Sequence, residues 1–447
     1  MSDPGFSNSS ERLHEIAERV LSLAHQRGAS ACEAAVSEGF GQTVSVRKNE
    51  IETIEYNRDK GVGVTIYLGT CLGHASTSDF SDAALISTVE AALSIARFTA
   101  PDVAAGLPEK ELLARDWADP QLHYPWDLTV ESAIELARTC EQAAFDVSPQ
   151  ITNSDGASVS TQQAQFVLAN SLGFIGGYPS SRHSMSCSVI AGEGDAMQRE
   201  YWYDSRRNAS ALDHAESIGR RAGERTIRRL GARKIATCEV PVLFEAPVAM
   251  TLLGNFTHAV SGGALYRNSS FLLDALGKQI FSPLVNILER PHEPGTFGAA
   301  PFDGEGVATQ ARDIVSDGVL NGYFLSSYSA RKLGMQTTGN AGGSHLLTMA
   351  ASGDEDFDAL VRRMGRGLVV TELLGQGVNY VTGDYSRGVA GYWVEGGEIV
   401  YPVQEVTIAG NLRDMFMGIS AVGNDALPRS AKRCGSILID RMTVAGS

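Results

Sequence analysis

The sequence predicts an α+β fold, with helix and antiparallel-sheet units in the N-terminal half followed by a glycine-rich, predominantly β C-terminal domain. In the first half, apolar residues recur at helical intervals on either side of short alternating runs. After residue 240, glycine, β-branched and aromatic residues dominate. The chain has 447 residues, enough for two or three domains. We expect these domains to cover residues 1–125 (including a linker), 126–236 and 237–447.

The first domain is predicted to begin with an amphipathic helix. Asn8 and Glu11 have the spacing of a capping box, and Gly28 is a suitable end. Apolar residues recur at helical intervals between these points. They are Leu13, Ile16, Ala17, Val20, Leu21 and Ala24.

A short antiparallel sheet and a second helix complete this domain. The predicted strands cover residues 43–47, 51–56 and 62–68. Lys48 and Asn49 form the turn between the first two strands. The helix spans residues 81–98. The stretch 100–125 contains four prolines and loses periodicity, so we interpret it as a linker.

The central domain repeats the order of helix and then sheet. A helix is predicted over residues 129–145, a turn at 154–156, and strands at 164–169 and 184–190. A further helix carries a cluster of arginines, which we interpret as a solvated face. The cluster is Arg220, Arg221, Arg225, Arg228, Arg229 and Arg233.

The C-terminal domain is predicted to contain a β-hairpin. Residues 389–394 and 398–408 are rich in β-branched and aromatic residues, and Gly396-Gly397 between them suits a two-residue turn. Because neighbouring side chains of a strand alternate, Tyr392 and Trp393 should point to opposite faces. We expect the sheet to be buried on one side, with one of these two residues in the core.

Composition narrows the classes of function. The chain has 52 acidic and 37 basic residues, a formal net charge of -15, so its field repels nucleic-acid backbones. No window approaches the roughly 18 apolar residues of a membrane span, and the N-terminus lacks an apolar signal core. We therefore expect a cytoplasmic protein without nucleic-acid or membrane partners.

Cysteines and histidines lack the spacing of a metal site. The six cysteines include no C-x-x-C pair, and we interpret them as reduced, mostly packed thiols. No two histidines lie three to five residues apart. A serine nucleophile in a G-x-S-x-G turn is also absent from the sequence.

The region from Val240 to Gly446 carries motifs of a known family. These are FEAPVA, DGEGVATQAR, GYFLSSYSARKLG, TTGNAGG, VTGDYSRG and EVTIAGNL. Together they resemble the C-terminal domain of the TldD/PmbA family, whose members are intracellular metallopeptidase subunits. The N-terminal half resembles the family more weakly, through VSVRKNEIETIE at residues 44–55. Ala308 departs from the pattern, which has proline there.

The resemblance also indicates a lost metal motif. In TldD-type subunits a His-Glu-x-x-x-His helix, together with a C-terminal cysteine, binds zinc. The matching positions here are Phe244, Glu245 and Ala249, and neither a phenyl ring nor a methyl group donates a lone pair to Zn²⁺. The chain therefore resembles the PmbA (TldE) branch, and we expect no metal ligand and no catalytic residue in it. Glu245 is interpreted as a helix cap, and Cys434, in the unmatched context AKRCGSILIDRM, as a packed or partly exposed thiol.

The family implies a function shared with a second subunit. It suggests that this chain joins a TldD-like zinc subunit in a heterodimer that degrades or trims unfolded peptides. When isolated, the chain could instead form a homodimer. Glycines that let two backbones approach could line the substrate channel. The candidates are Gly375, Gly377, Gly383 and Gly388, together with Asn379 in the same segment. The alternative is a regulatory protein that binds DNA gyrase or a toxin and has no peptidase role.

Overall fold

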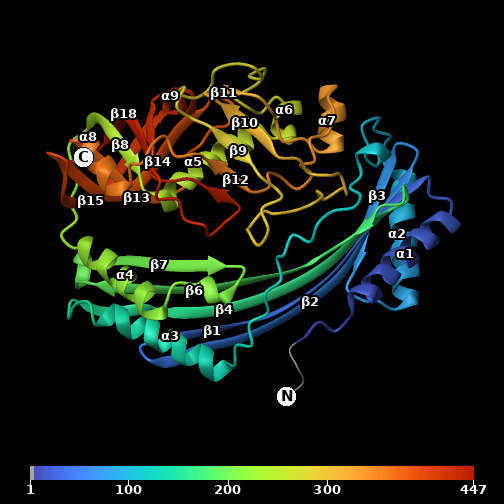
Figure 1. The fold of residues 1–447 in the computed structure, drawn as a ribbon, viewed down its shortest axis with the longest axis horizontal. Coiled ribbons are helices and arrows are strands. Elements are labelled where there is room, and N and C mark those ends of the chain that lie inside the picture. The colour runs from blue at the N-terminus through green and yellow to red at the C-terminus, as the bar shows by residue number, and fades with distance from the viewer. Residues whose placement is uncertain (1–4, 447) are drawn as a thin grey trace.

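In the computed structural model, which describes residues 5–446, one seven-stranded sheet carries both the first and the central unit. Its order is β3-β2-β1-β4-β6-β7, with β5 paired to β4. The sheet curves beneath the C-terminal region, which lies on its concave side (Figure 1). The strands are β1 (Ala31–Arg47), β2 (Glu50–Leu68), β3 (Cys71–Thr77), β4 (Ile151–Asn170), β5 (Ile175–Gly176), β6 (Pro179–Ala191) and β7 (Gln198–Arg206).

Two pairs of helices cover the outer face of this sheet. They are α1 (Ser10–Gln26), α2 (Asp82–Phe98), α3 (Val130–Phe145) and α4 (Ala215–Arg228). Ala34 and Val36 of β1 pack in one core with α1 and α2, whereas Val44 and Val46 of the same strand pack with α3 and α4. Because residues two apart share a face, both pairs lie on the same side of the sheet, at its two ends (Figure 1).

The strands are much longer than predicted. The expected strand 43–47 is the end of β1, the strands 51–56 and 62–68 are parts of the single strand β2, and β7 was missed. The inward-facing positions of β1 are small or polar, for example Ser37 and Gly39, so the hydrophobic alternation that marks a strand is weak there. The expected turn at 154–156 is a register shift within β4.

The ends of the predicted helices are nearly right. Helices at 81–98 and 129–145 are confirmed to within one residue. The first helix is capped by Ser9, whose hydroxyl accepts a hydrogen bond from the Arg12 amide, and not by Asn8. Asn8 donates its backbone and side-chain N–H groups to Glu38 instead. The turn at Lys48-Asn49 is confirmed, since both residues have positive φ angles.

The C-terminal region contains a bent sheet that closes on itself. Its order is β15-β14-β13-β8-β18-β16, and β15 also pairs with β18. These strands are β8 (Cys238–Phe244), β13 (Gly367–Leu374), β14 (Asp384–Glu395), β15 (Glu398–Asn411), β16 (Ile419–Val422) and β18 (Ile437–Ala445). A smaller sheet contains β9 (Ile287–Glu289), β10 (Arg312–Ser316), β11 (Val319–Leu320), β12 (Leu347–Met349) and β17 (Lys432–Arg433).

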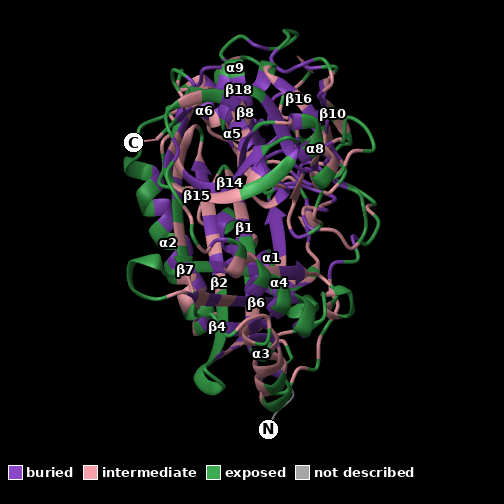
Figure 2. Ribbon diagram, turned by 90° about the vertical axis from the view of Figure 1, so that its left-hand side faces the viewer, coloured by how far each residue is buried: buried purple, intermediate pink, exposed green. Residues whose placement is uncertain are grey.

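Helices pack around these two sheets. They are α5 (Ala246–Ala259), α6 (Gly262–Tyr266), α7 (Ser327–Leu333), α8 (Phe357–Met364) and α9 (Leu412–Met417). Buried residues run through this region and along the strands of the large sheet (Figure 2). The mixture of helices and largely antiparallel strands confirms the α+β class.

The predicted hairpin is present, but its burial differs from the prediction. Gly396 and Gly397 join β14 to β15 with φ angles of 62° and 80°. Trp393 packs in the large core with α5, whereas Tyr392 packs in a second core with Leu360 of α8. The two side chains do point to opposite faces. The expectation of burial on one side was wrong, because layers cover both faces of the sheet.

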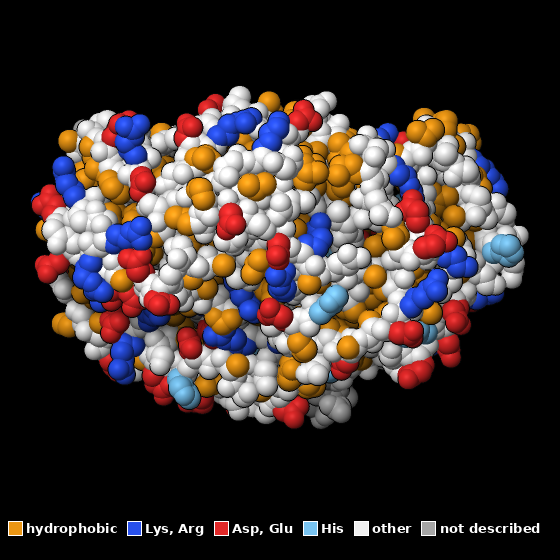
Figure 3. All heavy atoms as spheres, turned by 45° about the horizontal axis from the view of Figure 1, so that its top comes forward, with side chains coloured by type: hydrophobic (Ala, Val, Ile, Leu, Met, Phe, Trp, Pro, Cys, Tyr) orange, Lys and Arg blue, Asp and Glu red, His pale blue; other side chains and the backbone are white. Residues whose placement is uncertain are grey.

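Acidic and basic side chains are interspersed over the face seen in Figure 3. Within residues 5–446, no helix is both long enough and apolar enough to cross a membrane.

Candidate functional site

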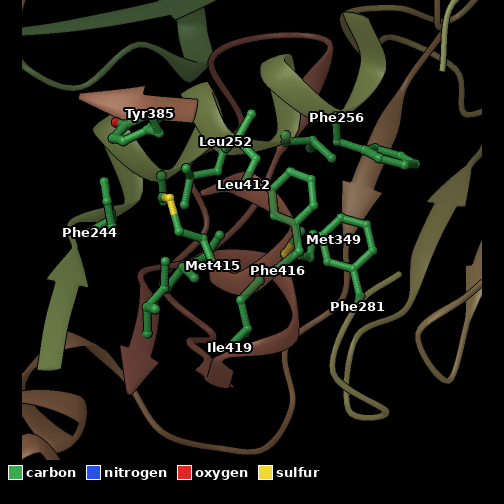
Figure 4. Packing of buried hydrophobic residues seen from close by; sticks show 14 of the residues in the cluster. Phe244, Leu252, Phe256, Phe281, Met349, Tyr385, Leu412, Met415, Phe416 and Ile419 are labelled. Atoms are coloured by element: carbon green, nitrogen blue, oxygen red, sulfur yellow. The ribbon is translucent and has the colours of Figure 1, made fainter. Parts of the chain in front are cut away.

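The position of the family's metal motif lies where β8 ends and α5 begins. Phe244 is the last residue of β8, Glu245 precedes the first turn of α5, and Pro247 fits that turn. Phe244 and Ala249 are fully buried in the large apolar core, part of which Figure 4 shows around Phe244 and Leu252. The two side chains that replace the imidazoles are therefore core residues.

Glu245 occupies the N-cap position of α5 as predicted, but its side chain forms a two-point ion pair in place of a capping bond. Its carboxylate accepts hydrogen bonds from Nη1 and Nη2 of Arg225, at 2.7 Å and 3.0 Å, and makes no capping bond to α5. Burial alone would lower the pKa of Arg225, but Glu245 and then Glu200 outweigh it and raise that pKa above its ordinary value. The carboxylate is thus held in a fixed orientation by a permanent cation.

The ion pair belongs to a larger buried network. Arg225 Nε lies 3.6 Å from Glu200 of β7, and Arg229 bridges Glu200 at 2.9 Å and Glu372 of β13 at 3.0 Å. Side chains from α4, β7, β13 and the start of α5 meet here. The network therefore connects the large sheet and its helix to the C-terminal region.

The solvated-face interpretation of the arginine cluster was wrong for two members. Arg229 is 5% exposed and Arg225 is largely buried, both within the network. Arg220 and Arg228 are exposed, as expected. Arg221 is exposed as well, but its guanidinium lies 3.7 Å from the centre of the Trp202 ring.

A cleft of about 700 Å³ opens beside Glu245. Its lining includes arginines of α4, Trp202, the start of α5 and the start of α8. Asp356, Asp358 and Asp425 contribute carboxylates to the same lining. The cleft thus has mixed charge and can contact both donors and acceptors of a polar chain.

Cys434 lies close to the same helix start but is not exposed to the cleft. The hydroxyl of nearby Ser436 accepts a hydrogen bond from the amide of Ala246 at 3.1 Å. Cys434 itself is 1% exposed in the large core, and burial, with a smaller contribution from Asp425, raises the pKa of its thiol. The thiol is therefore packed and protonated, in agreement with the sequence interpretation.

The residues at this place do not fit a zinc ion. Phe244 and Ala249 offer no lone pair, and Glu245 is already paired with Arg225. Across residues 5–446, we find no group of three or more His, Cys, Asp or Glu side chains placed to hold a metal ion. No chemical step in this chain can be derived through a metal at the motif position.

The glycines expected to line a substrate channel lie in and before β14. Gly377 approaches the backbone of Ser386, whose N–H donates to the Gly377 carbonyl at 2.7 Å. Gly388 lies between β13 and β15, both of which pair with β14. The other three candidates, Gly375, Asn379 and Gly383, lie in the connecting loop. Their role in binding a peptide stays a prediction.

A carboxyl cluster, in which Asp303 is buried and Glu33 and Glu305 are partly buried, lies between the large sheet and the C-terminal region. Glu33 of β1 faces Asp303 and Glu305. Burial, followed by the charges of Glu305 and Asp303, raises the pKa of Glu33 to about 7. Asp303 accepts three backbone hydrogen bonds, from Glu305, Val307 and Ala341, yet burial still raises its pKa to about 6.

Comparison with known proteins identifies the family to which this fold belongs. The sequence matches all three domains described for PmbA/TldA metallopeptidases: domain 1 over residues 32–96, the central domain over 123–230 and the C-terminal domain over 237–446. The chain belongs to the PmbA/TldD family. It is 48% identical over 434 residues to a protein named metalloprotease PmbA from Escherichia coli O157:H7, covering 97% of this chain and 96% of that relative.

More distant relatives include both branches. A metalloprotease PmbA homolog of Haemophilus influenzae is 46% identical, over 98% of this chain and 97% of its own, and a TldD homolog of that organism is 24% identical, over 88% of each. A crystal structure from Bacteroides thetaiotaomicron, described as a candidate modulator of DNA gyrase, superposes with a TM-score of 0.93 at 28% identity. It covers 98% of this chain and 100% of that one. TldE of Thermococcus kodakarensis shares the fold, with a TM-score of 0.84 at 20% identity and coverage of 96% and 100%.

Proposed function

We propose that this chain is the PmbA (TldE)-type subunit of a two-subunit metallopeptidase, in which a TldD-type partner supplies the zinc and this chain helps to hold an unfolded peptide. The proposal rests on which residues occupy the position of the family's metal motif and on what they contact. Phe244 and Ala249 are core residues, and Glu245 is fixed by Arg225. A carboxylate so engaged does not act as a base on a metal-bound water.

The cleft beside Glu245 supports a role in binding the peptide. It offers both guanidinium groups and carboxylates, so it can contact the carbonyl and amide groups of an extended chain without selecting a sequence. The -15 net charge favours a peptide over a nucleic acid as the ligand.

Peptidase assays with the two subunits test the proposal. This chain alone should not cleave an unstructured peptide, a mixture with a TldD-type subunit should cleave it, and a chelator should abolish cleavage. Glu245→Gln in this chain should change the rate of the mixture little, whereas the same change at the glutamate of the partner's motif should abolish it.

Two outcomes would contradict the proposal. Steady, chelator-insensitive cleavage by this chain alone would show an active site that the motif position does not contain. A mixture no more active than the TldD-type subunit alone would instead favour the regulatory alternative, in which the chain binds DNA gyrase or a toxin and takes no part in proteolysis.

A further inference from the structure

Two arginines meet at one aromatic ring on the concave side of the large sheet. Met185 and Cys187 of β6 pack in the core with the outer helices, so Arg182, which alternates with them, faces the concave side. Arg207 directly follows the end of β7. The guanidinium carbons of Arg182 and Arg207 lie 5.4 Å and 4.7 Å from the centre of the Phe297 ring, which belongs to the loop after β9. The two cations therefore lie where the sheet meets the C-terminal region.

Neither guanidinium has an acidic partner within residues 5–446. The preceding arginine has one, since Nε of Arg206 lies 3.0 Å from a carboxylate oxygen of Asp204. In the same part of the chain, no carboxylate lies within 4.0 Å of Arg182 or Arg207. Burial, and then the charge of Arg182, lower the pKa of Arg207 below its ordinary value. The pair is thus a local positive site in a chain whose net charge is -15.

The pair also offers hydrogen-bond donors. Nε of Arg182 donates to the Ser205 hydroxyl at 3.0 Å, and Nη1 of Arg207 donates to the Ser181 carbonyl at 2.9 Å. Among the described residues, both Nη atoms of Arg182 and Nη2 of Arg207 have no acceptor, and Nε of Arg207 is buried without one. A buried donor without an acceptor is rare in proteins and indicates a missing partner.

Anchoring of the Phe297 loop is the structural alternative. The ring is 8% exposed, and the contact with Arg207 is a cation–π interaction that fixes it to the sheet. A second guanidinium at the same ring adds the repulsion between like charges. Arg182 is exposed, so it could turn away into solvent at little cost. Anchoring therefore accounts for one arginine and not for two.

Hydroxyl groups continue from the pair along the concave side. Ser184 and Ser186 follow Arg182 at every second position of β6 and are partly buried. Their partners in β4 are Ser160 and Ser158. Because a hydroxyl group both donates and accepts hydrogen bonds, these residues suit the backbone of a bound chain whatever its side chains are.

The chemistry of the pair selects a carboxylate as its ligand. A guanidinium group presents a planar fork of N–H donors that matches the two oxygens of a carboxylate. A nucleic acid would be repelled by the rest of the chain, which is acidic. A peptide that carries one carboxylate is repelled far less, and its backbone matches the neighbouring hydroxyl groups.

We propose that Arg182 and Arg207 bind the carboxylate of a peptide, supplied either by its C-terminal end or by an acidic side chain. The peptide backbone then lies along the serine hydroxyl groups of β6 and β4. This inference rests on the proposed function for the choice of a peptide as ligand. It adds a binding site outside the lining of the cleft beside Glu245.

Isothermal titration calorimetry of the full-length chain at low salt tests the ligand. The probe is an acetylated hexapeptide of alternating serine and alanine with a free C-terminal carboxylate, which should bind about tenfold more tightly than its C-terminal amide. The same amide with one alanine replaced by glutamate distinguishes the sources. Tight binding of this peptide assigns side-chain carboxylates as well, and binding as weak as that of the neutral amide restricts the site to chain ends. Equal affinity for the acid and the neutral amide, or no binding of the acid, would overturn the proposal.

Substitutions test the two arginines. Arg182→Gln, at an exposed position, should reduce the preference for the free acid at least fivefold, and Arg207→Lys, which keeps the charge but not the planar fork, should also reduce it. Arg199→Gln is the matched control, because Arg199 of β7 carries the same charge but is paired with Asp155 at 3.3 Å. An unchanged preference in Arg182→Gln, or an equal loss in Arg199→Gln, would contradict the assignment. Circular dichroism spectra that match the wild type would show that each variant is folded.

The outcome is separable from that of the peptidase assays, because binding is measured on this chain alone. If a mixture with a TldD-type subunit does not cleave but the preference for the acid is found, the proposed function fails and the carboxylate site stands. If the mixture cleaves and no preference is found, the carboxylate site alone is refuted.

Discussion

Replacing Arg225 with methionine should destabilise the protein by about 3 kcal/mol. The change keeps most of the apolar stem but leaves Glu245 without its two hydrogen bonds, at 2.7 Å and 3.0 Å, and removes one of the two cations beside Glu200. Breaking a buried pair by removing one partner costs about 3–5 kcal/mol. We take the lower end because Glu245 borders the cleft and can recruit water there.

Urea unfolding followed by far-ultraviolet circular dichroism measures this loss. Arg228→Met is the matched control: Arg228 is an exposed arginine of the same helix and the same cleft, so its replacement should change the free energy of unfolding by less than about 0.5 kcal/mol. Arg225→Met combined with Glu245→Gln should cost less than the sum of the two single changes, because the second change removes the unpaired charge. If Arg225→Met costs no more than Arg228→Met, the network contributes nothing to stability and our reasoning is refuted.

Three further results are expected. After dialysis the purified chain should contain far less than one zinc per molecule by elemental analysis, because Phe244 and Ala249 provide no ligands; one bound zinc per chain would contradict this. Folding raises the pKa of Glu33 to about 7, so the protonated carboxyl group stabilises the folded state. This stabilisation is complete below the ordinary pKa of a glutamate and is lost as the pH rises through about 7. Glu33→Gln should therefore reduce the fall in unfolding free energy between pH 5 and pH 8, by on the order of 3 kcal/mol, and an unchanged pH profile would refute the assignment. A fragment of residues 1–125 should show no cooperative thermal unfolding, because β1 loses its pairing with β4 over Glu33 to Val46, whereas residues 1–236 should unfold cooperatively; a stable short fragment would contradict this.

The sequence predicted local features well where one residue type decides the conformation. The turns at Lys48-Asn49 and Gly396-Gly397 have the expected positive φ angles. The helix over 129–145 has Thr129 as its cap. These signals depend on backbone geometry within a few residues and need no knowledge of tertiary contacts.

Strand length and burial were harder to predict, because they depend on what lies against each face. The concave side of β1 carries Ser37, which is exposed, and Gly39 and Gly41, which are partly buried. This part of the strand therefore has no hydrophobic pattern on that side, and the strand was recognised only from Thr43. Tyr392 and Trp393 are both buried because a second layer, which includes α8, covers the face of the sheet on which Tyr392 lies and which was expected to be exposed.

The candidate site was predicted in part. The absence of ligands at Phe244 and Ala249 could be read from the residues, but the partner of Glu245 could not. Arg225 lies 20 positions earlier, on a helix whose six arginines looked alike. One signal was available in the sequence. Arg225 and Arg229 are four positions apart and lie on the same side of the helix as the small residues Ala222 and Thr226. Small residues indicate a helix face that packs closely against another element.

The ion pair between Arg225 and Glu245 bears on whether a metal centre could be built at the position of the family's motif. Restoring histidine at positions 244 and 249 would return two nitrogen donors to the end of β8 and the first turns of α5. The glutamate between them would still be oriented away from that task by its two bonds to a guanidinium, whose positive charge would also repel an incoming Zn²⁺. Such a metal centre would therefore require a third substitution on α4, in a different structural unit. In the two-subunit enzyme proposed above, the division of roles would then be hard to reverse by single mutations, because the necessary changes are spread over two units.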